Sequence, residues 1–139
     1  MYLRPNILKR MIAMDYDLIF ISSIWFGSWM LIIEFFKEEN PEALGIVLAI
    51  LVYYLYEVIL ITKYRTVGQR ALGFKCVNFK NGEKLTVGKA TIRFIVKFLF
   101  GSISLLIVPF TKDNRAIHDF LSGSIVISEK EPYPPDDIR

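Results

Sequence analysis

The sequence is poor in the residues from which enzymes build most reactive or metal-binding centres. It has one cysteine, Cys76, so no disulfide can form within the chain, and one histidine, His118, which cannot hold a metal ion unaided. His118 has no nearby cysteine or serine in a motif of defined spacing, so the usual nucleophile–base pair is missing. We therefore expect no enzymatic activity, no catalytic residue, no metal and no cofactor.

Motifs for nucleotides, nucleic acids and secretion are also missing. The segment Gly68–Gly73 is neither a Walker loop nor a dinucleotide fingerprint. The basic middle of the chain lacks the aromatic platforms and fold motifs of nucleic-acid-binding domains, so we expect no nucleic-acid partner. Lys9 and Arg10 precede an apolar run that is too long for a signal peptide and has no small-residue cleavage site. We expect this run to be an uncleaved membrane anchor.

Long hydrophobic runs are plentiful. Of the 139 residues, 53% are hydrophobic, which is more than soluble domains usually contain. Two runs, 18–36 and 43–62, are each about 20 residues long, and a helix of that length covers about 30 Å, one hydrocarbon thickness. Pro41, in the short acidic turn between them, suits a helix start. The pattern predicts a two-span transmembrane helical hairpin, with spans at 16–36 and 43–62.

Lysine and arginine are distributed unevenly around the two spans. Arg4, Lys9 and Arg10 precede the first span, whereas the turn carries Lys37 among three glutamates. From position 63 to position 97 the chain is rich in lysine and arginine, with Glu83 as its one acid. Because basic short loops stay on the cytoplasmic side, we expect a multi-pass protein of the cell (inner/cytoplasmic) membrane. Its N-terminus and basic middle loop should be cytoplasmic.

The segment 66–87 is too polar for a span and has strand character. Residues 71–79 are rich in strand formers, and Asn81-Gly82 is a strong hairpin turn sequence. We predict a small cytoplasmic β-hairpin over 66–87, with its return strand starting at 85–87. A further strand at 123–128 should stabilise it, because an isolated hairpin is only marginally stable. Pairing of 123–128 with 71–79 requires the chain to return to the cytoplasm.

The third apolar segment, 89–111, has two interpretations. Phe94–Phe110 is about the minimum length for a full crossing. However, Lys89, Arg93 and Lys97 recur every four residues, which is typical of a helix whose basic face lies on an anionic leaflet. The expected strand pairing favours an interfacial or re-entrant segment. We therefore expect anionic lipid at the cytoplasmic face as a partner, and a disordered tail at 130–139.

Ionisable groups inside spans are candidates for function because burying them is costly. Asp17 lies two helical turns after Arg10 on the same face, and Glu57 lies at a matching depth in the second span. The two carboxylates either share a proton or bracket a cation, or they form structural pairs. In the second case Asp17 pairs with Arg10, and Glu57 pairs with Arg70 or Arg93.

Ser23 and Gly27 have the spacing of small residues at close helix contacts. The second helix is the obvious partner for this face, and a dimer is the alternative.

Three blocks of the sequence together resemble the RDD family of small integral membrane proteins, named for one arginine and two aspartates. The blocks are Arg10-Met11-Ile12-Ala13-Met14-Asp15-Tyr16-Asp17, then 65–74 (RTVGQRALGF), then 114–127, which contains Asp119. The second block is similar to a T-x-G-K-R-x-L-G pattern, with Gln69 in place of the lysine. The resemblance implies a membrane hairpin with an irregular membrane-associated remainder. It implies no settled activity, only suggestions of transport and of partnership with other membrane proteins.

These features support two hypotheses about function. If the chain returns as argued, a network of charged residues can gather at the cytoplasmic interface and clamp the spans onto the β unit. Its expected members are Arg10, Asp17, Glu57, Arg70, Arg93 and Asp119. The first hypothesis is a proton- or cation-linked transport component that acts as a homo-oligomer, since two or three spans enclose no pathway. The alternative is a non-enzymatic accessory or regulatory subunit that docks onto a partner membrane protein.

Overall fold

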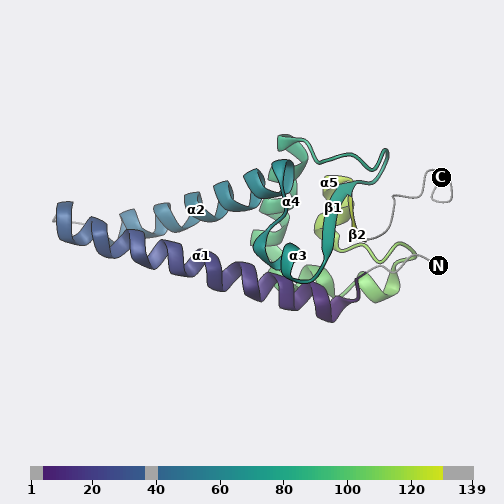
Figure 1. Cartoon of the computed structure of the whole chain (residues 1–139), viewed down its shortest axis with the longest axis horizontal. Coiled ribbons are helices and arrows are strands. Elements are labelled where there is room, and N and C mark those ends of the chain that lie inside the picture. Colours follow the sequence, from purple (N-terminus) through teal and green to yellow (C-terminus); the bar gives the residue numbers. More distant parts are fainter. Residues whose placement is uncertain (1–4, 37–40, 130–139) are drawn as a thin grey trace.

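The computed structural model describes residues 5–36 and 41–129. Its most prominent feature is a pair of long helices, α1 (Ile7–Phe36) and α2 (Pro41–Lys63), which project together from a compact unit (Figure 1). Both are long and apolar enough to cross a membrane, over Ile7–Glu34 and Glu42–Lys63. Part of the expected acidic turn, residues 37–40, and the tail expected to be disordered lie outside the described residues. The helical hairpin matches the expectation from the sequence.

The two helices contact each other through tryptophan and glycine. Trp25 Nε1 donates a hydrogen bond of 2.9 Å to the carbonyl oxygen of Gly45. The Trp29 ring lies so close to Gly45 that a β-carbon there would be 2.7 Å from it. Ser23 and Gly27 face outward instead, and a β-carbon on Gly27 would meet nothing within 4 Å. The expectation that these two small residues pack against the second helix is therefore wrong, because the tryptophan rings occupy that contact.

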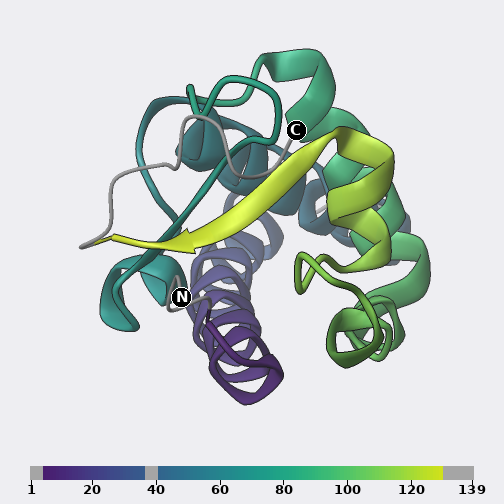
Figure 2. The same ribbon diagram turned by 90° about the vertical axis from the view of Figure 1, so that its right-hand side faces the viewer.

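The compact unit comes after α2 and packs against the first turns of α1 (Figure 2). It consists of α3 (Val67–Ala71), β1 (Phe74–Asn78), α4 (Val87–Phe100), the 3₁₀ turns η1 (Gly101–Leu105) and η2 (Val108–Phe110), α5 (Ile117–Ser122) and β2 (Ser124–Ser128). Strands β1 and β2 are antiparallel, with Phe74 opposite Ser128 and Asn78 opposite Ser124. The pairing of 71–79 with 123–128 thus occurs as the sequence suggested.

The local hairpin expected over 66–87 is not present. Its first part forms α3, which Thr66 caps by accepting a hydrogen bond from the Gln69 backbone N–H at 3.3 Å. Asn81-Gly82 does make a turn, in which Gly82 N–H donates to the Asn78 carbonyl at 2.9 Å. However, the chain then enters α4 at Val87 instead of returning as a strand. The partner of β1 is β2, whose Ser-Ile-Val-Ile-Ser run is almost wholly buried and pairs along all five residues.

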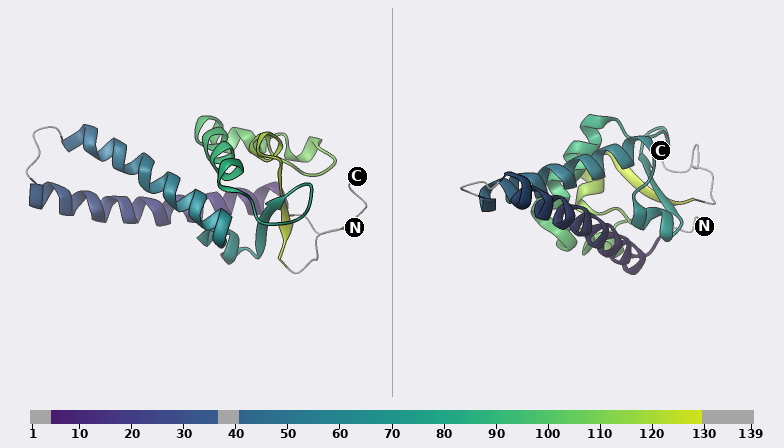
Figure 3. Two further views of the ribbon diagram at one scale, coloured as in Figure 1. Left: turned by 90° about the horizontal axis from the view of Figure 1, so that it is seen from above. Right: turned by 60° about the vertical axis from the view of Figure 1, so that its left-hand side comes forward.

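Helix α4 runs across the long axis of the hairpin instead of along it (Figure 1; Figure 3). Its 14 residues span about 21 Å at the helical rise, less than the bilayer core. Arg93 and Lys97 are buried, whereas Ile95 and Leu99 are exposed. The expected basic face therefore points into the protein rather than toward lipid, because carboxylates of α2 and α5 lie on that side. Because β1 pairs with β2, Phe79 and Gly123, which begin and end the segment between the two strands, lie next to each other.

Candidate functional site

Asp119 occupies the centre of a buried charge network. It is fully buried, and its carboxylate accepts a hydrogen bond from Arg10 Nη1 at 2.9 Å and another from the Arg93 guanidinium. The Ser124 hydroxyl donates to it at 3.3 Å, and the Ala116 backbone N–H donates to it at 3.1 Å. One carboxylate thus joins α1, α4, α5 and β2.

The position of Asp119 is explained by the local sequence. It lies in the first turn of α5, where an acidic side chain satisfies free backbone N–H groups and complements the helix dipole. Burial alone would raise the pKa of Asp119, but the charges of Arg93 and Arg10 and the Ala116 N–H bond outweigh that effect. The pKa therefore lies well below its ordinary value, and Asp119 is an anion at neutral pH.

Glu57 forms a separate buried ion pair. Its carboxylate accepts a hydrogen bond from Lys97 Nζ at 2.8 Å, and the two side chains are 1% and 6% exposed. This pair joins α2 to α4. The expected partners were Arg70 and Arg93, and Lys97 was not among them, although Lys97 lies one turn after Arg93 on the same helix face. The repeated spacing of these cations is a sequence signal for the pair, but it is equally consistent with lipid contact.

Asp17 caps the start of α3 instead of pairing with Arg10. It accepts hydrogen bonds from the Gly68 backbone N–H and from the Tyr56 hydroxyl, each at 2.8 Å. A β-carbon at Gly68 would lie 2.0 Å from the carbonyl oxygen of Ala13, so only glycine lets α3 approach α1 this closely. Within 5–36 and 41–129, Asp17 is a buried carboxylate without an ion pair.

Arg70 lies outside this network. Its side chain is exposed, and its guanidinium lies 5.9 Å from the centre of the Tyr64 ring. Of the six residues expected to gather, the structure brings Arg10, Arg93 and Asp119 into direct contact. Glu57 is connected through Lys97, Asp17 lies beside the group, and Arg70 is turned away.

A small cavity lies within the network. Its volume is about 30 Å³, enough for one or two water molecules. The Nε and Nη2 atoms of Arg10 and the Nε atom of Arg93 are buried without a hydrogen-bond partner among the described residues. The polar side chains lining the cavity are those of Arg10, Asp17, Gln69, Arg93, Lys97 and His118. In the part of the chain that the structure describes, no group of three or more His, Cys, Asp or Glu could hold a metal ion.

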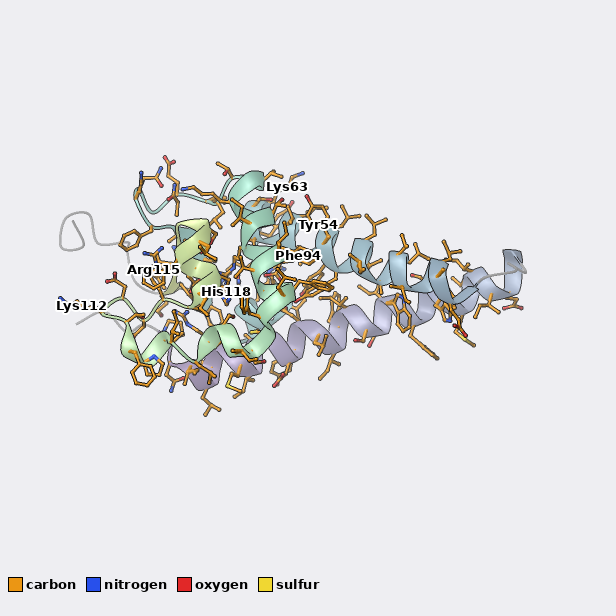
Figure 4. The ribbon with its side chains drawn as sticks, turned by 180° about the vertical axis from the view of Figure 1, so that it is seen from behind. Tyr54, Lys63, Phe94, Lys112, Arg115 and His118 are labelled. Carbon is orange, nitrogen blue, oxygen red and sulfur yellow. The ribbon has the colours of Figure 1, made fainter. Side chains whose placement is uncertain are left out.

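Two further buried polar residues were not among the expected members of the charge network. Arg115 donates from Nε to the Ser124 carbonyl and from Nη2 to the Asp119 carbonyl, each at 3.0 Å, and lies between two phenylalanine rings. His118 Nδ1 is 2.7 Å from the Ser104 hydroxyl, and Figure 4 shows it inside the compact unit. Burial, followed by the charge of Arg93, lowers the pKa of His118 to about 3, so this histidine is neutral. Both residues belong to the 114–127 block that carried the family resemblance.

The sequence matches a known protein family and a curated bacterial protein. The family model described as "RDD family" matches residues 4–123. A similar curated protein is "Uncharacterized membrane protein YteJ" of Bacillus subtilis (strain 168), which is 33% identical over 84 residues. The matched region covers 58% of this chain and 51% of YteJ, so the chain spans about half the length of this relative. No solved structure matches the chain. With the family model matching from before α1 to the end of α5, the chain belongs to the RDD family of membrane proteins.

Proposed function

We propose that this protein is a non-enzymatic accessory or regulatory subunit that docks onto another membrane protein through its helical hairpin. The compact unit would lie on the cytoplasmic side of the cell membrane, where the excess of lysine and arginine after α2 favours it. The observation that carries the proposal is the open face of α1 at Ser23 and Gly27. Small residues on a membrane helix allow close approach of another helix, and α2 does not use this face.

The charge network supports a positioning role for the compact unit. Glu57 and Asp119 form buried ion pairs with cations of α1 and α4, and Asp17 holds the start of α3. Buried ion pairs that join separate elements restrict how those elements can move relative to one another. The hairpin is therefore presented at a fixed angle to the compact unit, as docking to a partner requires.

The size of the polar cavity also favours docking over transport. A cavity of about 30 Å³ accommodates water but not a continuous path. It lies where the hairpin meets the compact unit. Away from that unit α1 and α2 run together (Figure 3), and there Trp25 and Trp29 of α1 contact Gly45 of α2.

The test compares two leucine substitutions that add similar bulk to exposed positions of α1. Gly27→Leu fills the small-residue face, and Ser22→Leu adds a side chain on a different side of the helix. The tagged full chain is purified from its native membrane in mild detergent after cross-linking in the membrane. We expect one stoichiometric membrane-protein partner with wild type and Ser22→Leu, and its loss with Gly27→Leu. Recovery of homo-oligomers alone, or equal recovery of the partner with both variants, would contradict the proposal.

A second candidate function rests on Asp17. This carboxylate lines the polar cavity without an ion pair to any described residue, beside Gln69, where the family pattern has a lysine. A proton or small cation at Asp17, in a homo-oligomer that completes a pathway, would make the protein a transport component.

Flux measurements separate the two functions. Purified protein in liposomes is tested under proton and sodium gradients as wild type, Asp17→Asn and Glu57→Gln. Flux in wild type that Asp17→Asn abolishes, with folding intact, would favour transport. Absence of flux from the folded wild-type protein under either gradient is the result that the accessory role predicts.

A further inference from the structure

The exposed position of Arg70 leads to a second surface of the molecule. Since Arg70 takes no part in the buried network, that network gives no reason for an arginine at this position. It lies instead at the edge of a groove of about 380 Å³ between α1, α2 and α3. The groove's lining residues include Phe20, Leu55, Ile59, Leu60, Arg65 and Arg70.

The floor of this groove is apolar and faces outward from the hairpin. Phe20, Leu55 and Ile59 are 42%, 44% and 44% exposed. Leu55 lies eight residues before the end of α2 at Lys63, which places the floor within about 12 Å of that end by helical rise. In a spanning helix this is the depth of the acyl chains of one leaflet, just below the headgroups.

The mouth of the groove is cationic. Arg70 lies in the last turn of α3 with its guanidinium over Tyr64, and within the described part of the chain it makes no ion pair. Arg65 pairs with Glu129 at 2.5 Å and remains 29% exposed. None of the described residues that line the groove is acidic. Guanidinium groups bind phosphate oxygens in paired, charge-assisted hydrogen bonds, so the charge and the depth both suit a lipid headgroup.

We propose that this groove binds one anionic phospholipid. Its acyl chain lies along Phe20, Leu55 and Ile59, and its phosphate contacts Arg70 and the exposed edge of Arg65. The site is independent of the docking function proposed above, because the open Ser23 and Gly27 positions are not part of it. It also differs from the sequence-based expectation of lipid contact, which rested on the cations of α4.

Native mass spectrometry of the full chain tests the site. The detergent-solubilised protein is titrated with phosphatidylglycerol or phosphatidylcholine, and bound lipids are counted by mass. Wild type should retain one phosphatidylglycerol more tightly than any phosphatidylcholine. Arg70→Gln should weaken that first phosphatidylglycerol roughly tenfold, since one charge-assisted contact with phosphate is lost. The matched control Lys80→Gln neutralises another exposed cation of the compact unit and should bind as wild type.

A second variant separates the groove from a general surface charge effect. Ile59→Trp fills the apolar floor without changing charge and should remove the tight lipid while leaving the thermal midpoint unchanged, because Ile59 is exposed. Three results would each overturn the proposal. They are equal phosphatidylglycerol binding by the Arg70 and Lys80 variants, equal retention of the two lipids by wild type, and unaltered lipid binding by Ile59→Trp.

Discussion

Replacing Asp119 with asparagine removes a carboxylate that lies between two buried arginines. The change keeps the size of the side chain and one acceptor oxygen, so the packing of α5 is preserved. Arg10 and Arg93, which are 4% and 5% exposed, would then face each other without the anion that now lies between them. Removing one partner of a buried ion pair costs about 3–5 kcal/mol, chiefly because the remaining charge stays desolvated.

That cost is large beside the stability of an ordinary domain, which is about 5–15 kcal/mol. A loss of about 3–5 kcal/mol lowers the ratio of folded to unfolded protein by roughly two to four orders of magnitude, since each 1.4 kcal/mol is a factor of ten. Arg10→Gln should cost less than Asp119→Asn, because Arg93 still neutralises the carboxylate. The double variant should cost less than the sum of the two single changes, as expected for residues in one network.

The assay is thermal unfolding and size-exclusion chromatography in mild detergent. Asp119→Asn should elute mostly as aggregate or unfold well below wild type. Asp15→Asn, which changes an exposed aspartate of α1 in the same way, should behave as wild type. An Asp119→Asn variant with the thermal midpoint of the Asp15 control would refute the role of Asp119 as the centre of the network.

Three other predictions concern single elements of the fold. His118 has its pKa held at about 3 by burial, against about 6.5 when unfolded. The contribution of neutral His118 to the free energy of unfolding should therefore be complete above about pH 6.5. It should decrease by about 1.4 kcal/mol per pH unit as the pH falls toward 3. His118→Asn should remove this pH dependence from the free energy of unfolding measured between pH 6.5 and 4. Gly68→Ala should destabilise the protein by about 1–3 kcal/mol or more, because its β-carbon would meet a backbone oxygen of α1 at 2.0 Å. Gly88→Ala, in an open helix position, should stabilise it by about 0.5–1 kcal/mol. Equal thermal unfolding midpoints for the two variants would contradict this. Glu57→Met and Lys97→Met should each be destabilising, but the double variant should recover most of the loss because no unpaired charge remains buried, and additive losses would argue against a direct pair.

The helical hairpin and the strand character of 123–128 could be predicted because their causes are local. Runs of about 20 apolar residues have few alternatives to a span, and the residues of 123–128 have the strand character needed to pair with β1. The hairpin at Asn81-Gly82 failed because a turn sequence fixes only the turn. The element after that turn depends on which strand competes for the edge of β1, and β2 offers five buried or half-buried residues that pair along the whole of β1.

The sequence predicted most of the residues of the charge network, but it did not predict which of them pair with each other. A helix face that carries Arg93 and Lys97 is equally consistent with anionic lipid outside and with carboxylates inside. The choice depends on where Glu57 and Asp119 lie in space, which spacing along the chain does not determine. Likewise, the spacing of Arg10 and Asp17 placed them on one face of α1, but each has its partner on a different, later element.

The contact between Arg10 and Asp119 joins residues 109 positions apart, which has a consequence for biogenesis. Synthesis proceeds from the N-terminus, so α1 and α2 leave the ribosome before Asp119 does. Until then Arg10 lacks the anion that it contacts in the folded protein. The final position of α1 is therefore set only when the last elements dock. A chain truncated before α5 would lack the carboxylate that contacts both Arg10 and Arg93.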